Sequence, residues 1–132
     1  MKQLIKNWWG HKSLFAVAVF YSILMMVASL MPTGDFPRVK IQWADKYVHA
    51  SLHFILILLW LFTVYSKSLK RKEAIIMWLV FLACAVFGIL IEVCQELFTQ
   101  SREADLYDVL ANLLGSLIGI TVFSLSRKHL KL

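Results

Sequence analysis

The stretch that decides the fold of this chain reads AIIMWLVFLACAVFGILIEVCQELF and occupies residues 74–98. It exceeds the roughly 20 apolar residues that an α-helix needs to cross about 30 Å of hydrocarbon, so it predicts a transmembrane helix. Glu92 lies in the last third of this stretch, and Gln95 and Glu96 follow it at helical spacing. A charged side chain near the bilayer centre costs about 2.5–3.5 kcal/mol on insertion scales. We therefore expect Glu92 to have polar partners or a function.

The composition of the whole chain agrees with a membrane protein. Hydrophobic residues make up 60% of the 132 residues, whereas they make up about half of a usual soluble domain. The mean hydropathy is +0.70. Apolar stretches that approach or reach the length of a membrane span lie at residues 14–31, 47–65, 74–98 and 106–125. The sequence thus predicts an all-α membrane protein: one transmembrane domain over residues 1–132, built as a bundle of four helices.

The distribution of charge predicts the topology. The net charge is +6, and most basic residues flank the four stretches on one side of the membrane: Lys2, Lys6, Lys12, Lys67, Lys70, Arg71, Lys72, Arg127, Lys128 and Lys131. By the positive-inside rule both termini are cytoplasmic. The basic residues are accounted for by membrane topology and do not require a nucleic-acid partner. We therefore predict membrane lipids and no nucleic acid as partners.

Two features of the chain have plain interpretations. The first apolar stretch is longer than the 7–15 residues of a signal-peptide core, so we predict a retained helix. Cys84 and Cys94 lie within one predicted helix, where they cannot pair with each other.

The polar residues of three predicted helices fall at the outer end of the bundle. In the second helix Asp45, His49 and His53 are spaced by four, which places them along one face. The third helix ends near Glu92, Gln95 and Glu96, and the fourth begins with Asp105, Asp108 and Asn112. Small residues continue the same faces at Gly88, Gly115 and Gly119, and such residues allow membrane helices to approach closely. We expect tight packing toward the cytoplasmic side and a polar cavity near the outer leaflet.

The sequence resembles the VanZ-like family of bacterial integral membrane proteins. The resemblance covers nearly the whole chain and rests on the order and spacing of Ser29, Pro32, Asp45, Lys46, His49, Gly88, Glu92, Gln95, Arg102, Asp105, Asp108, Asn112 and Gly115. His53 and Glu96 are outside the family pattern. The family is named for an accessory protein of glycopeptide-resistance clusters that is associated with reduced susceptibility to teicoplanin. The resemblance implies a multi-pass protein of the bacterial cytoplasmic membrane with a role in the cell envelope, and it implies no particular reaction.

One interpretation of the polar cluster is an acid–base site. His49 would be the acid or base and Glu92 its partner, because burial and neighbouring acids shift such groups toward proton transfer. Lys46 and Arg102 would hold a phosphate, pyrophosphate or sugar head group of a lipid-linked envelope precursor, since Arg binds phosphate oxygens in a bidentate manner. The candidate binding residues are Asp45, Lys46, Gln95, Arg102, Asp105, Asp108 and Asn112.

Three alternatives remain open. The same cavity would suit a protein that binds a lipid or an antibiotic target without chemistry. Alternatively, the buried polar residues fix helix register through interhelical hydrogen bonds. A metal is the minor alternative: His49 and His53 at i and i+4 can share zinc with Glu92 or Asp108. The segment lacks an HExxH motif, so we predict no metal, and we assign no cofactor or oligomeric state.

Overall fold

The described part of the chain is a bundle of four α-helices. The computed structural model describes residues 10–31, 43–65, 73–99 and 104–130, which contain α2 (His11–Leu30), α3 (Ala44–Tyr65), α4 (Glu73–Phe98) and α5 (Leu106–Leu130). Each helix is long and apolar enough to cross a membrane, and these residues contain no strand. The predicted fold class, an all-α protein with four transmembrane helices, is confirmed.

The helices extend beyond several of the predicted boundaries. Helix α2 begins at His11 rather than residue 14, α3 begins at Ala44 rather than residue 47, and α5 ends at Leu130 rather than residue 125. An apolar window detects only the part of a helix that lies in hydrocarbon. The polar ends are helical too, because Asp45 suits the first turn of α3 and basic residues suit the last turn of α5.

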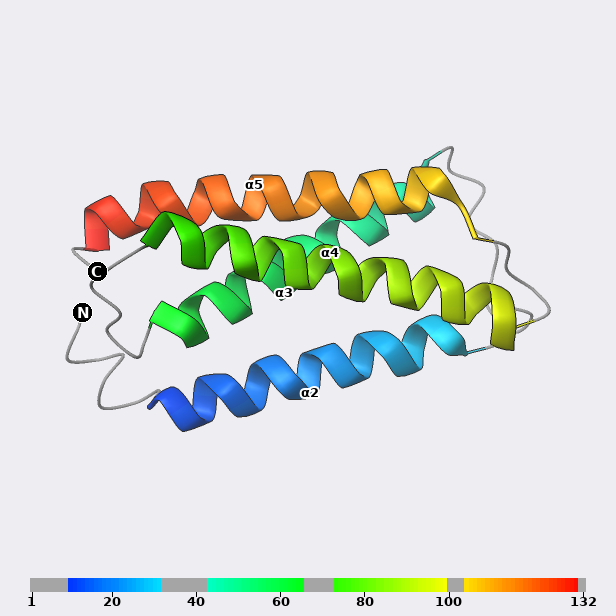
Figure 1. Cartoon of the computed structure of the whole chain (residues 1–132), viewed down its shortest axis with the longest axis horizontal. Coiled ribbons are helices and arrows are strands. Elements are labelled where there is room, and N and C mark those ends of the chain that lie inside the picture. Colours follow the sequence, from blue (N-terminus) through cyan, green and yellow to red (C-terminus); the bar gives the residue numbers. More distant parts are fainter. Residues whose placement is uncertain (1–9, 32–42, 66–72, 100–103, 131–132) are drawn as a thin grey trace.

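The four helices run in alternating directions, so two ends of the bundle can be distinguished. We call the end where α2 and α4 finish and α3 and α5 begin the polar end (Figure 1). Helix α2 contacts α3 and α4 and lies on the opposite side of α4 from α5 in this view. The start of α2 and the end of α5 both lie at the other end of the bundle. This is consistent with the prediction that both termini lie on one side of the membrane. Their cytoplasmic location stays a prediction.

Helices α3 and α5 form the most extensive contact in the bundle. A Cβ atom added at Gly115 would stand 2.0 Å from the carbonyl oxygen of Ala50, and one added at Gly119 would stand 2.4 Å from Cγ2 of Ile57. The expected close packing at these two glycines is therefore present, because Gly115 lies against the backbone of α3 and Gly119 against the side chain of Ile57.

The apolar core lies between the helices, toward the end opposite the polar end. It contains Leu56, Ile57 and Leu61 of α3 and Phe123 of α5. Phe123 also contacts the ring of Phe62 edge to face, with centroids 5.0 Å apart. Large apolar side chains elsewhere on the four helices face outward, as expected where lipid rather than water is the solvent.

An ion pair connects α4 and α5 at the end of the bundle opposite the polar end. Arg127 of α5 pairs with the carboxylate of Glu73 at the start of α4. Tyr65 at the end of α3 joins them, because its hydroxyl donates to the Glu73 carbonyl at 2.9 Å and its ring lies 5.6 Å below the Arg127 guanidinium. Three helices are thus connected at this end by groups at or near the membrane surface.

The close contact at Gly115 makes a direct prediction. Gly115→Ala should destabilise the bundle by roughly 1–3 kcal/mol, the usual cost of overpacking, because the new methyl group meets backbone atoms of α3 that cannot rotate away. Thermal unfolding in mild detergent measures this. Leu114→Ala, at the exposed position one residue earlier in the same helix, is the control. Equal unfolding temperatures for the two variants would contradict the close α3–α5 packing.

Candidate functional site

Lys46 organises the charged groups at the polar end. Its ammonium donates to Asp105 Oδ2 at 2.6 Å and to Asp108 Oδ1, and it lies 3.8 Å from Asp45 Oδ2. Of the lysines and arginines that the structure describes, this is the one at the polar end. The contacts join the first turn of α3 to the start of α5. They also mean that the ammonium already has carboxylate partners.

Asp105 lies just before α5, and the contact with Lys46 lowers the pKa of its carboxyl group. The Lys46 ammonium and, secondly, the backbone N–H of Tyr107 hold the pKa of the Asp105 carboxyl below its usual range, because both donate to the charged form. The Tyr107 N–H donates to Asp105 Oδ1 at 2.9 Å. Asp105 therefore stays ionised and acts as the cap of α5, in agreement with its predicted position there.

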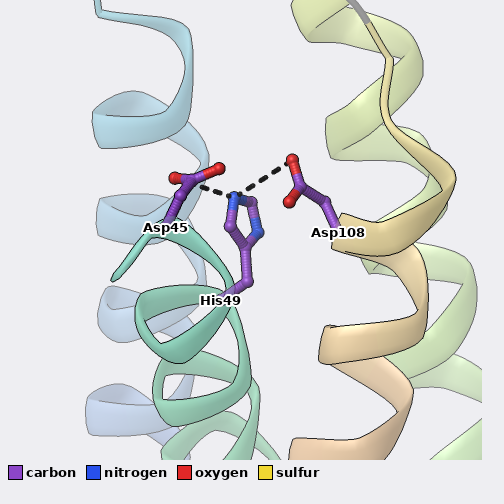
Figure 2. A group of neighbouring side chains, drawn as sticks. All are labelled: Asp45, His49 and Asp108. Atoms are coloured by element: carbon purple, nitrogen blue, oxygen red, sulfur yellow. Dashed lines mark ion pairs between the residues drawn. The ribbon is translucent and has the colours of Figure 1, made fainter. Parts of the chain in front are cut away.

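His49 lies among carboxylates from three helices. Figure 2 shows its ring between Asp45, one turn earlier in α3, and Asp108 of α5. Its Nε2 is 3.7 Å from Asp45 Oδ1 and 3.5 Å from Asp108 Oδ2, while Nδ1 on the other edge is 3.9 Å from Glu92 Oε1. These distances reach or exceed the hydrogen-bond range. The ring thus lies among carboxylates without a short hydrogen bond to any of them.

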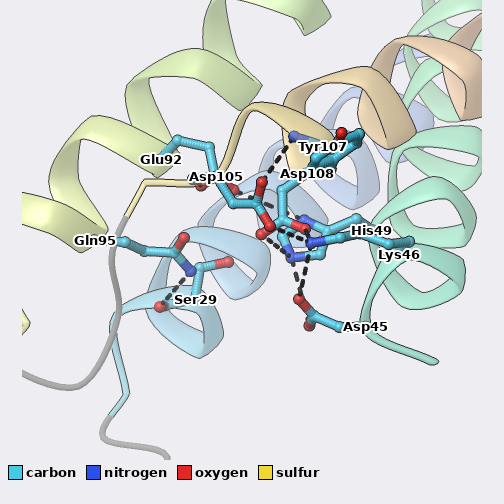
Figure 3. Close-up of polar contacts among 9 residues, drawn as sticks. All are labelled: Ser29, Asp45, Lys46, His49, Glu92, Gln95, Asp105, Tyr107 and Asp108. Carbon is cyan, nitrogen blue, oxygen red and sulfur yellow. Dashed lines mark hydrogen bonds and ion pairs between the residues drawn. The ribbon is translucent and has the colours of Figure 1, made fainter. Parts of the chain in front are cut away.

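Glu92 is the deepest carboxylate of the cluster, with only 3% of the residue exposed. Its Oε2 accepts a hydrogen bond of 3.4 Å from the backbone N–H of Asp105, and its Oε1 faces His49 without a hydrogen-bond partner. The expected convergence of α3, α4 and α5 on one site is seen in Figure 3, where α2 also contributes through Ser29.

A cavity of about 170 Å³ lies beside His49. All four helices contribute to its lining, which includes Met25, Ser29, Asp45, His49, His53, Ile91 and Asn112. Gly88 leaves space beside this group: an added Cβ there would stand 2.8 Å from His53 Cε1 and 3.2 Å from Asn112 Nδ2. The small residue predicted on this face therefore accommodates buried polar side chains.

Several buried polar atoms near the cavity lack hydrogen-bond partners among the described residues. They are His53 Nδ1, Glu92 Oε1, Asn112 Oδ1 and Ser116 Oγ. Buried polar groups in folded proteins are nearly always paired, with protein or with ordered water. His53 and Asn112 line the cavity, so His53 Nδ1 and Asn112 Oδ1 can bond a molecule that enters it. Glu92 Oε1 lies beside His49, which also lines the cavity.

Gln95 connects two helices at the polar end, and its role in binding stays a prediction. Its Nε2 donates to the backbone carbonyl of Ser29 at 2.9 Å, which ties the end of α4 to the end of α2. Only 2% of Gln95 is exposed. Arg102, the other predicted cation of the site, lies outside the described residues.

Sequence patterns did not identify two polar side chains, the buried Ser116 and the half-buried Tyr21. Ser116, one turn beyond Asn112, is 1% exposed, and its spacing from Asn112 is the signal that would have marked it. Tyr21 of α2 donates its hydroxyl to the Leu52 carbonyl at 3.0 Å. No pattern along α2 predicts that bond, because a lone tyrosine in an apolar helix has no periodic partner.

The described residues gather a different set of metal-ligand atoms from the one in the metal alternative. Atoms of Asp45, His49 and Asp108 all lie within 4.8 Å of one another, whereas the alternative combined His49 and His53 with Glu92 or Asp108. His and carboxylate ligands with an open position are compatible with zinc. Here, however, Asp108 already binds the Lys46 ammonium and Asp45 lies near it. A divalent cation would compete with Lys46, so we keep the prediction of no metal.

Removing the ammonium should destabilise the bundle. Lys46→Met should cost about 3 kcal/mol, the lower end of the range for a broken buried pair, because Lys46 is partly exposed while Asp108 is left buried and unpaired. Chemical or thermal unfolding in detergent measures this. The double variant Lys46→Met/Asp108→Asn should recover part of the loss, since it removes the orphaned charge. A double variant no more stable than Lys46→Met would contradict the assigned pairing.

Comparisons with known proteins identify the family of the chain. The VanZ/LLP1 family model matches residues 6–127, nearly the whole chain. The chain is also similar to the uncharacterized protein C11E3.10 of the fission yeast Schizosaccharomyces pombe, with 32% identity over 113 residues that cover 86% of this chain and 65% of that protein. This chain thus spans slightly less than two thirds of that relative. No solved structure matches the chain. The extent of the family match shows that this four-helix membrane protein belongs to the VanZ/LLP1 family.

Proposed function

We propose that the cavity at the polar end binds the polar head group of a lipid-linked envelope component and that His49 and Glu92 exchange protons with it. The observation that carries this proposal is the position of His49. Its ring lines a cavity while buried Glu92 faces Nδ1 and two further carboxylates face Nε2. A histidine held in this way can accept or donate a proton within the cavity. His49 and Glu92 are the proposed catalytic residues.

The described charges favour a head group that donates hydrogen bonds. The polar end holds the four carboxylates of Asp45, Glu92, Asp105 and Asp108. Among the described lysines and arginines only Lys46 lies there, and its ammonium already binds carboxylates. Hydroxyl or amine groups of a sugar head would find acceptors in Asp45 and Asn112 Oδ1, which line the cavity, and would reach Glu92 Oε1 beside His49. A phosphate would require Lys46 to leave its carboxylates, or a contribution from Arg102. We therefore favour the hydroxyl-bearing part of such a component over its phosphate.

The unpaired buried atoms also bear on the purely structural alternative. Side chains that serve only to fix helix register would be expected to bond other helices, as Gln95 does with the backbone carbonyl of Ser29. Glu92 Oε1 and Asn112 Oδ1 have no such partner among the described residues. This favours a ligand in the cavity. Binding without chemistry is the second candidate function, since the same unpaired atoms serve a binder equally well.

The cellular setting of this function is also a proposal. We infer the cytoplasmic membrane of a bacterium, with the polar end facing outward, from the charge distribution and the resemblance to VanZ-like proteins. A similar chain in fission yeast means that such proteins are not confined to bacteria. An influence on teicoplanin susceptibility would follow if capture of an envelope precursor changes how the antibiotic reaches its target in the wall.

Lipids that co-purify with the protein test the site. Wild type, Glu92→Gln and Glu96→Gln should be expressed in the same strain, purified in mild detergent and compared by native mass spectrometry. Glu96 is an exposed carboxylate on the same helix and is the matched control. Losing a charged acceptor costs about 2 kcal/mol, so Glu92→Gln should retain roughly 30-fold less of a hydroxyl-bearing lipid. Unselective lipids at equal occupancy in all three proteins would contradict the proposal.

The second prediction separates catalysis from binding. Wild type incubated with the lipid that co-purifies with His49→Gln should convert it, as followed by mass spectrometry, and a chelator should not change the rate. His49→Gln should slow conversion by about 10²–10⁴-fold, the usual contribution of a positioned acid or base, while it retains the lipid. His129→Gln, at an exposed position at the other end of α5, is the control. Retention of the lipid without conversion by wild type would favour the binding protein.

A further inference from the structure

A second cavity lies deeper in the bundle and has an apolar lining. Its volume is about 300 Å³, and it lies between α2, α3 and α4. The residues that line it include Ser22, Leu56, Trp60, Val80, Cys84 and Phe87. The proposed function assigns no role to this cavity.

The polar groups of the second cavity are satisfied by the protein itself. The indole N–H of Trp60 donates to Ser22 Oγ at 3.1 Å, and the Ser22 hydroxyl donates to the Ala18 carbonyl at 2.8 Å. The remaining side chains named in its lining are apolar or, for Cys84, a thiol that packs as a small apolar group. The cavity therefore suits hydrocarbon rather than a polar head group.

The two cavities follow one another along the same three helices. Met25 of α2, Leu52 of α3 and Ile91 of α4 belong to the lining of the polar cavity. One helical turn further from the polar end, each helix places a residue in the lining of the apolar cavity: Ser22, Leu56 and Phe87. Matching steps of three or four residues in all three helices correspond to about 5 Å along the bundle. The polar and apolar cavities thus lie next to each other along the bundle, between the same three helices.

We propose that the apolar cavity holds the hydrocarbon chain of the same amphiphile whose head group lies beside His49. This inference rests on the proposed function for the position of the head. The chain would pass Met25, whose unbranched side chain adapts to its neighbours, and would end beside Trp60. Because a cavity of about 150 Å³ holds benzene, 300 Å³ has room for about a dozen carbon atoms. The ligand class is therefore an amphiphile that inserts one linear chain, acyl or prenyl, with further carbon atoms left in the bilayer.

Photolabelling tests the inference with defined probes. The full chain, reconstituted in phosphatidylcholine vesicles, is irradiated with dodecyl glucoside that carries a diazirine at the end of its chain. A farnesyl glucoside with the same group forms the second arm and distinguishes prenyl from acyl chains. Peptide mass spectrometry should place the label of at least one probe on Trp60, Val80 or Cys84, which line the cavity. Labels confined to lipid-facing residues such as Leu82 and Leu90 would overturn the inference.

Two variants connect the label to the cavity and to the head group. Ala83→Phe fills the apolar cavity and should reduce labelling of the lining by about tenfold, whereas Ala74→Phe, exposed on the same helix, should not. Glu92→Gln should reduce labelling because the head group loses its acceptor. If Ala83→Phe fails to fold, the wild-type label positions still decide the question.

The outcomes separate this inference from the proposed function. Cavity labelling that Glu92→Gln leaves unchanged would overturn the assignment of chain and head to one molecule. Loss of co-purified lipid in Glu92→Gln, together with no label in the wild-type cavity, would uphold the head-group site and overturn the chain site.

Discussion

The arrangement of the polar end depends on the contacts of the Lys46 ammonium with Asp105 and Asp108. A membrane-spanning bundle has little water to solvate charge, so clustered carboxylates require a cation or donated hydrogen bonds. By binding one oxygen of Asp108, Lys46 leaves the other facing His49. By joining α3 to the start of α5, it also holds Asp105 where its backbone N–H meets Glu92. The same ammonium thereby fixes both the helix ends and the surroundings of the histidine.

The bundle combines tight and open packing along its length. Gly115 and Gly119 bring α5 against α3, and the aromatic and aliphatic core around Phe123 fills the space toward the opposite end. The cavities both lie on the side of α2, where the contacts with α3 and α4 leave space. A rigid α3–α5 pair that carries His49 and Asp108, with α2 closing one side, is a suitable scaffold for a ligand that enters from the bilayer.

The sequence predicted the helices and the shared depth of their polar residues, because hydropathy and the spacing of Asp45, His49 and Glu92 follow directly from helix geometry. It did not predict that Lys46 pairs with Asp108, or that Gln95 bonds Ser29, since these contacts depend on how the helices rotate against one another. The apolar cavity was also beyond prediction. Its lining residues match the lipid-facing ones in composition, and only the three-dimensional packing separates them.

The central claim is that the buried polar residues at the polar end form a ligand site continuous with the apolar cavity. An experimental structure of the full chain in lipid nanodiscs, at a resolution that shows lipid chains, tests this most directly. We expect elongated density that runs from the cavity beside His49, past Met25, to the cavity beside Trp60. Closed cavities, with Glu92 and Asn112 hydrogen-bonded to each other and no density between α2 and α4, would contradict it and leave these residues a structural role.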